Sequence, residues 1–222
     1  GTLDPLSLNT GNIISTTYYS YTNYTGNDSF QYRVTDNYGR TATATVTIGV
    51  GSVIRNVASV DDFLAIDNDL YCKYRQTADL DFSVIQNDPQ KWYKSPVGFN
   101  GGSTPIEPFR GSYDGNGFKI RNWSFAILTS STIPIGLFLE LEGRVANVTL
   151  ENATVASSSG RVGGLVGTVL PNGDVTNSMV IGDVMGGWAI GGIAAINEGR
   201  INNSVFTGRI GNLRIKRTDN TY

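Results

Sequence analysis

A short phrase with glycine, a β-branched residue and asparagine recurs through the second half of this 222-residue chain. It occurs in "EGRVANVTLENATV" (142–155), "NGDVTNSMVIGDV" (172–184) and "EGRINNSVFTGRI" (198–210). Its asparagines are spaced 25, 30 and 26 residues apart and are Asn122, Asn147, Asn177 and Asn203. A second column, with spacings of 27 and 28 residues, consists of "IGLF" (135–138), "VGGLVG" (162–167) and "IGGIAA" (190–195). Two interleaved columns with one period are typical of a solenoid, whose repeats pack on their neighbours.

The composition of the repeats favours a β-solenoid, because β-branched residues and glycine disfavour helices. Parallel ladders would then join coils about 4.8 Å apart. Apolar residues stand two before and three after each asparagine; they are Ile120, Val145, Val175, Ile201, and Phe125, Leu150, Val180, Phe206. Both sets face inward only if the chain bends at the asparagine, which tolerates αL geometry. We expect its amide to replace lost ladder partners and to bond along the column, with Asn147 and Asn177 contributing most.

Residues 1–50 have the alternation of antiparallel strands. In "RTATATVTI" (40–48) apolar residues alternate with threonine, and "SFQYRV" (29–34) alternates likewise, which predicts one buried face. The turn residues of "TDNYG" (35–39) join the two into a hairpin. A lone hairpin is marginal in water, so we expect further strands from residues 6–22, with "STTYYSYTNYTG" (15–26) as the best candidate.

Residues 51–110 are expected to be a junction that leads into the solenoid. Ser59 is placed to cap a short helix over 59–66, with Asp61 and Asp62 in its first turn. "DLYCKYRQTADLDFSVI" (69–85) reads as extended chain, and "NGGSTP" (100–105) reads as a loop. We expect almost no helix elsewhere.

Two stretches resemble known families. "YTNYTGNDSFQYRVTDNYGRTATATVTIGV" (21–50) resembles the C-terminal half of the bacterial cadherin-like and immunoglobulin-like repeats of large surface proteins. "GGLVG" (163–167), with the preceding "TADLDFSVI" (77–85), resembles the GLUG motif and its usual entry segment, over roughly residues 55–212. The resemblance implies a secreted or surface-attached bacterial protein, such as an adhesin or an immunoglobulin-A1-cleaving metallopeptidase. It also implies accessory repeats to which no catalytic residues are assigned.

Composition excludes several functions. The net charge of −2 gives no electrostatic reason to expect nucleic acid or membrane binding. The absence of histidine excludes HExxH zinc sites and Ser-His-Asp triads within this segment. Cys72, the single cysteine, has no internal disulfide partner and reads as a small buried apolar residue. The opening "GTLDPLSLNTG", without an initiator Met, leads us to expect an excised piece of a larger protein.

Two groups of polar residues are weighed as cation sites. "YDGNG" (113–117) places Asp114 and Asn116 in a glycine-rich stretch that reads as a tight turn, with calcium as the alternative, because the EF-hand series is missing. Asp28 and Asp36 recur in the cadherin-like pattern. They read as structural turn acids, with junction calcium as the alternative.

Two further groups are weighed as catalytic or ligand sites. Asp79 and Asp81 have the i, i+2 spacing that puts two carboxylates on one strand face, where a sugar hydrolase would need them. A solvated strand face is the preferred interpretation. Trp123 is expected in the core, and Trp188 at a glycine-rich corner is the preferred candidate for ligand contact, with Trp92 as the third member of a possible sugar-stacking platform.

The sequence therefore predicts an all-β chain. We expect a partial cadherin-like or Ig-like β-sandwich segment (1–50), a junction and entry segment (51–110) and a GLUG-type β-solenoid (111–215). The predicted function is a non-catalytic extracellular module that spaces or displays a binding surface for attachment. Its expected partners are a cell-surface glycan or protein, or neighbouring repeats. No catalytic, cofactor or metal residue is assigned, although calcium stays open. The alternative is an accessory or carbohydrate-processing region of a secreted enzyme.

Overall fold

The computed structural model divides the chain into two compact units, Gly1–Val53 and Ile54–Tyr222. It is an all-β structure with a solenoid in its second unit, as predicted. The residues that the structure describes are 2–5, 7–8, 14–20, 26–50, 54–99, 107–127, 133–158 and 160–212. The predicted loop at 100–105 and the predicted end of the solenoid at 213–215 lie outside them.

The first unit is built on the predicted hairpin. β5 (Gly26–Thr35) pairs antiparallel with β6 (Thr41–Val50), and Thr35 lies opposite Thr41 beside the turn. Asp36 organises this turn, because its carboxylate accepts hydrogen bonds from the backbone N–H groups of Tyr38 and Arg40, both at 2.9 Å. Of the strands expected from residues 6–22, β2 (Ser7–Leu8) pairs antiparallel with β3 (Ile14–Ser15), and β4 (Tyr18–Tyr19) pairs with β1 (Thr2–Leu3), which precedes that range. Residues 21–25 of the best candidate stretch lie outside the described residues.

The apolar face of this hairpin is less buried than the alternation predicts. Phe30 lies opposite Val46, and both are half-buried. Nearer the turn, Tyr32 and Val34 are 45% and 50% exposed. The prediction of one continuous buried face is therefore wrong along the distal part of the hairpin, because no described element packs over it there.

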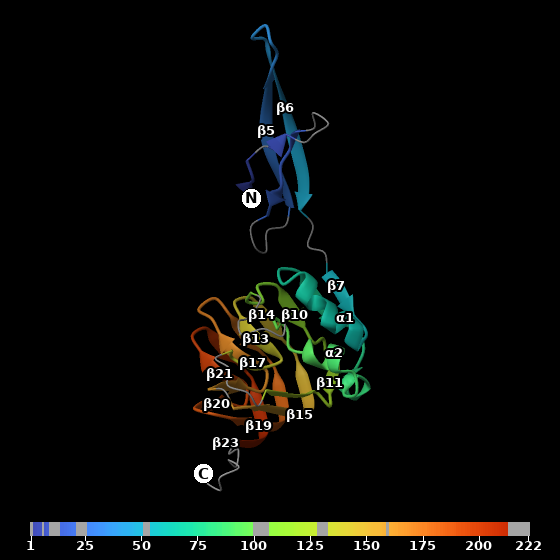
Figure 1. Ribbon diagram of the computed structural model, residues 1–222, viewed down its shortest axis with the longest axis vertical. Helices are drawn as coiled ribbons and strands as arrows, with labels where there is room; N and C mark the ends of the chain where they lie inside the picture. Colours follow the sequence, from blue (N-terminus) through green and yellow to red (C-terminus); the bar gives the residue numbers. More distant parts are fainter. Residues whose placement is uncertain are drawn as a thin grey trace. The chain divides into compact units, whose positions relative to one another are not determined.

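The second unit is a stack of coils joined by parallel ladders (Figure 1). The first ladder consists of β7 (Ile54–Val57), β8 (Lys73–Gln76), β10 (Ser112–Asp114), β14 (Arg144–Ala146), β18 (Asp174–Thr176) and β22 (Arg200–Asn202). The second consists of β9 (Leu80–Asp81), β11 (Lys119–Arg121), β15 (Thr149–Ser157), β19 (Met179–Gly186) and β23 (Val205–Asn212), with β12 (Ser124–Ile127) also on β15. The third consists of β13 (Phe138–Leu141), β17 (Val166–Val169) and β21 (Ala194–Asn197), and a short fourth pairs β16 (Arg161–Gly163) with β20 (Ala189–Gly191).

One coil runs from β14 through an asparagine corner into β15, and then through β16 and β17 to β18 in the next coil. The second predicted column is confirmed, because Ile135 bridges Val162 and Val162 pairs with Ile190. β8 and β9, within the predicted junction, lie in the same ladders as the later coils.

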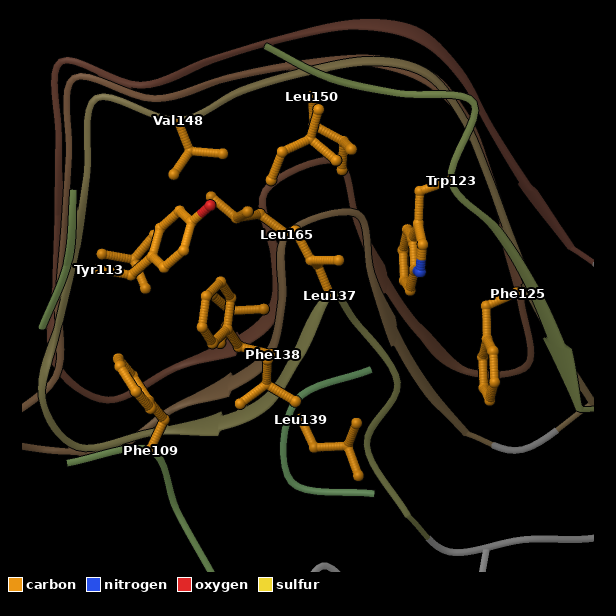
Figure 2. Packing of buried hydrophobic residues seen from close by; sticks show 14 of the residues in the cluster. Phe109, Tyr113, Trp123, Phe125, Leu137, Phe138, Leu139, Val148, Leu150 and Leu165 are labelled. Carbon is orange, nitrogen blue, oxygen red and sulfur yellow. The ribbon is translucent and has the colours of Figure 1, made fainter. Parts of the chain in front are cut away.

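The core changes in character along the stack. Aromatic rings fill the first coils, and Figure 2 shows Phe109, Tyr113 and Phe138 pointing into the interior. The rings of Tyr113 and Phe138 have centroids 5.7 Å apart in an edge-on arrangement. The later coils stack smaller side chains, such as Leu150 on Val180, both fully buried.

Helical turns pack beside the first coils. α1 (Val60–Leu64) begins as predicted at Ser59, whose hydroxyl accepts a hydrogen bond from the Asp62 N–H at 3.1 Å. Phe63 of α1 is buried against Tyr113, with ring centroids 5.6 Å apart.

Other helical structure is limited, as expected, to short turns in the part of the chain that the structure describes. η1 (Ala65–Asn68) extends the predicted segment, and η2 (Phe82–Ile85) and α2 (Pro89–Tyr93) are additional turns that were not predicted. α2 forms because Asp88 caps it and Pro89 occupies its first turn, where a missing N–H costs nothing. The same local capping by Asp81 turns the end of the predicted extended stretch into η2.

Candidate functional site

Three of the four aligned asparagines form a corner column. Asn147, Asn177 and Asn203 follow paired strands of the first ladder and have φ of 55°, 51° and 47°, so the predicted αL corner is confirmed. The Asn177 amide donates to the side-chain oxygen of Asn147 at 3.4 Å, and Asn147 donates to Asp114 at 2.8 Å. The backbone N–H of Asn147 stays in the ladder and donates to the Thr176 carbonyl at 3.0 Å. The amide therefore joins coils rather than replacing a lost backbone partner.

Asn122 does not belong to this column, so its predicted alignment is wrong. Because β10 pairs with β14, Gly115 occupies the corner position next to Asn147. Asn122 instead lies beside Asn152, which also has positive φ and donates to its side-chain oxygen at 2.7 Å. The solenoid thus has a second asparagine corner, in the ladder of β11 and β15.

Serine supplies the corner bonds that we expected from asparagine. The Ser178 hydroxyl accepts from the Val148 N–H at 3.3 Å and donates to the Thr176 carbonyl at 3.0 Å. One coil later, the Ser204 hydroxyl accepts from the Ser178 N–H at 3.2 Å and donates to the Asn202 carbonyl at 2.9 Å. The only signal in the sequence is the dipeptide Asn-Ser, which recurs in these two coils.

Asp79 and Asp81 are both engaged in contacts between coils. Asp79 accepts from the Lys119 N–H at 2.7 Å and pairs with the Arg121 guanidinium at 2.9 Å. Asp81 accepts from the Asn122 amide at 2.8 Å and from the Ser83 N–H at 2.9 Å. The Lys119 N–H lowers the pKa of Asp79, and the Asn122 amide lowers the pKa of Asp81. A general acid for sugar hydrolysis needs the opposite shift in pKa.

Of the candidate calcium residues, Asp36 and Asp114 lie at hydrogen-bonded turns, whereas Asp28 lies within strand β5 opposite Ile48, so its interpretation as a turn acid is wrong. Asp114 accepts from the Asn116 N–H at 2.9 Å, and Asn116 has φ of 51°, as in the predicted tight turn. The Arg40 side chain pairs with Asp36 at 2.7 Å, and Asp28 accepts from the Tyr18 hydroxyl at 2.6 Å. Among the described residues, no three His, Cys, Asp or Glu side chains gather to hold a metal ion.

The three tryptophans do not form a platform. Trp123 is fully buried, as predicted, and its indole N–H donates to the Ser95 hydroxyl at 3.0 Å. Trp92 is half-buried and stacks on Phe125 with centroids 5.0 Å apart. Trp188 is 75% exposed beside Gly160, and its contact with a ligand stays a prediction. Cys72 is half-buried and packs against the core.

A depression of about 180 Å³ lies on the outward face of the first ladder, and sequence reasoning missed it. It spans β7, β8, β10 and β14, and the corner asparagine Asn147 lies at its edge. Its lining residues are Ile54, Lys73, Tyr74, Arg75, Ser112, Tyr113, Asp114, Arg144, Ala146 and Asn147. It is a concave site in which a hydroxyl, an amide, a carboxylate and three cationic side chains converge, as binding sites require.

Comparison with known proteins places the first unit in a class. The family described as "Bacterial Ig domain" matches residues 3–49, which confirms the predicted Ig-like segment.

The wider chain is similar to Halomucin of Haloquadratum walsbyi, with 33% identity over 189 residues. The match covers 72% of this chain and 2% of Halomucin. No solved structure matches the chain. Within the described residues, no helix is both long and apolar enough to cross a bilayer. Together the Ig-like domain and the similarity to Halomucin fit the role of a structural or surface module.

Proposed function

We propose that this chain is a non-catalytic, extracellular module of a large surface protein, which spaces or displays a binding surface for attachment. Its solenoid is of the GLUG type and its first unit is a cadherin-like variant of the Ig fold. An Ig-like unit followed by a solenoid, and similarity to 2% of a much longer protein, support a modular role. The partner is a glycan or protein of a cell surface.

The observation that carries this proposal is the continuity of the first ladder. Six strands from β7 to β22 pair in parallel, so backbone hydrogen bonds join every coil to the next. Such a stack is a stiff element, because each coil is held by its neighbours and its core is densely filled. Outward side chains on its ladders are therefore held in fixed columns about 4.8 Å apart.

The outward acids are hydrogen-bonded or ion-paired to residues of neighbouring coils, which supports a non-catalytic role. Hydrogen bonds stabilise the charged forms of Asp79 and Asp81, and Arg121 pairs with Asp79, so the pKa values of both acids are lowered. Glu151 is likewise paired with Lys119 at 2.6 Å and with Arg121 at 3.2 Å. These carboxylates hold coils together, and none is poised to donate a proton near neutral pH.

The test uses the whole 222-residue chain and the double variant Asp79→Asn, Asp81→Asn. We expect the chain to bind intact cells or isolated cell-surface polysaccharides and to release no reducing ends from a polysaccharide panel. The double variant should bind equally well wherever it remains folded by circular dichroism. Hydrolysis that disappears in the double variant would favour the carbohydrate-processing alternative, and absence of binding to every cell and polysaccharide would refute the attachment role.

A further inference from the structure

The depression on the first ladder arises from the sizes of the outward side chains. One outward column runs through Ile54, Lys73, Ser112 and Arg144, in the register of the ladder. The neighbouring outward column includes Ala146 of β14. The small Ser112 lies between Lys73 and Arg144 in this register, and Ala146 is likewise small, so these positions leave space beside the longer side chains of adjacent coils.

Positive charge dominates this depression although the whole chain is slightly acidic. Three cationic side chains, Lys73, Arg75 and Arg144, line it together with one carboxylate, Asp114. Asp114 is already bonded to the corner amide of Asn147 at 2.8 Å, and its contact with Arg75 is long, at 3.9 Å.

The other two cations are also weakly compensated. Arg144 reaches Asp174 at 3.5 Å, a carboxylate that Arg200 shares at 3.8 Å. Lys73 has no ion-pair partner within the part of the chain that the structure describes. A pocket with this excess of positive charge favours an anionic group, which the guanidinium and ammonium donors can bond directly.

We propose that the depression binds an acidic sugar residue of a polysaccharide, with its carboxylate or sulfate held by Lys73, Arg75 and Arg144. The volume of about 180 Å³ is below that of pockets for drug-sized ligands, so it accommodates one ring while the polymer continues along the solenoid face. Ser112, Asn147 and Asp114 offer a hydroxyl, an amide and a carboxylate to ring hydroxyls. Half-exposed Ile54 offers an apolar edge to the C–H face of a ring. This inference rests on the proposed attachment role and names its ligand class.

The test measures binding of the whole chain to polygalacturonate, chondroitin sulfate, neutral dextran and poly-glutamate by calorimetry at low and moderate salt. Lys73→Gln and Arg144→Gln change outward side chains at the depression. Arg200→Gln is the matched control, because Arg200 lies on the same ladder and shares Asp174 but does not line the depression. Circular dichroism of each variant checks that the fold is kept.

We expect binding to at least one acidic polysaccharide, weakened by salt, with dextran much weaker. Each depression variant should lose about tenfold or more in affinity, since each removes a charge-assisted bond, and Arg200→Gln should stay within about twofold. Preference for polygalacturonate or for chondroitin sulfate tells which anion is recognised. Equal losses in Arg200→Gln, equal binding of poly-glutamate, or no binding of either acidic polysaccharide would overturn the proposal. Cell attachment that persists unchanged in the depression variants would overturn this site while leaving the proposed function intact.

Discussion

The corner asparagine Asn147 offers the sharpest test of how coils are joined. It sits at φ 55°, donates to the Asp114 carboxylate at 2.8 Å and accepts from the Asn177 amide at 3.4 Å. Replacing Asn147 by Ala removes both side-chain bonds and places in αL geometry a residue that tolerates it less well than asparagine. Replacing it by Gly removes the same bonds but leaves the backbone unstrained.

The expected energies of the αL strain and of the two side-chain hydrogen bonds of Asn147 distinguish the two variants. The αL strain of a non-glycine residue is about 1 kcal/mol, and asparagine is among the residues that tolerate it best. The bond to a carboxylate contributes about 1.5 kcal/mol, and the longer bond to Asn177 contributes less. We therefore expect Asn147→Ala to lower the free energy of unfolding by about 2–3 kcal/mol and Asn147→Gly by about 1–2 kcal/mol.

Asn203 is the matched control. It has φ of 47° in the last described coil. The Asn147 side-chain oxygen accepts a hydrogen bond from the Asn177 amide, but no described side chain donates to the Asn203 amide in this way. Asn203→Ala should cost only the strain, about 1 kcal/mol. The measurement is urea unfolding followed by tryptophan fluorescence, which reports the second unit because Trp92, Trp123 and Trp188 all lie there. Equal losses for Asn147→Ala and Asn203→Ala, with an unchanged slope against urea, would refute the argument that side chains join the coils.

Three further predictions use the same measurement. Trp123→Ala should lower the free energy of unfolding by about 3–5 kcal/mol, because the ring is fully buried. Trp188 is 75% exposed, so Trp188→Ala should change the free energy of unfolding by less than about 0.5 kcal/mol, and similar losses in the two variants would contradict the assigned burial. Gly115→Ala should lower the free energy of unfolding by about 3 kcal/mol or more, because the new Cβ would overlap the Asn147 carbonyl. Gly117 has φ of 82° and open space around it, so Gly117→Ala should lower the free energy of unfolding by only about 1 kcal/mol. The reverse order of the two losses would show that the corner register is wrong. Burial raises the pKa of Asp67 to about 6, so its charge destabilises the fold progressively as the pH rises from about 4 to about 6. Asp67→Asn keeps an acceptor for the Gly98 N–H and should raise the free energy of unfolding at pH 7 by on the order of 2 kcal/mol, with no gain near pH 4; a gain of equal size at both pH values would exclude titration as its cause.

The regular coils were predictable because residues with special backbone geometry recur at the positions that determine their register. Asn147 and Asn177 take the same αL corner, and Val162 and Ile190 pair in register 28 residues apart. Where two such columns keep one period, only a stack of coils satisfies both. The helix at Ser59 was predictable for a similar reason, because capping depends on neighbours in sequence.

Asn122 shows where this reasoning fails. Its surroundings, an apolar residue two before and another three after, match those of Asn147, yet it forms a different corner of the coil. Asn152 has the same local pattern, with Leu150 two before and Val155 three after. Local sequence cannot distinguish two αL corners within one coil, because both bend the chain in the same way. Only the pairing of β10 with β14, across a spacing of 32 residues, assigns them.

The depression was hidden for a related reason. Its outward column joins Ile54, Lys73, Ser112 and Arg144, whose spacings are 19, 39 and 32 residues. No repeat of fixed period connects these positions, so their charges are scattered in the sequence. These side chains lie close together because their strands pair, while the helical turns lie in the segments between the strands.

The irregular first coils and the candidate binding face therefore have one structural origin. Inserted segments around α1 and α2 bring aromatic rings such as Phe63 against Tyr113, and this packing supports the start of the ladder from within. With the inner face of β10 held by Tyr113, its outward position can carry the small Ser112 without loss of core. In the later coils the corresponding outward positions carry Asp174 and Arg200, which pair across the strands and fill the face. The depression consequently lies where the irregular first coils meet the first regular repeat at β14, as expected when a functional site departs from the rules that the rest of the fold obeys.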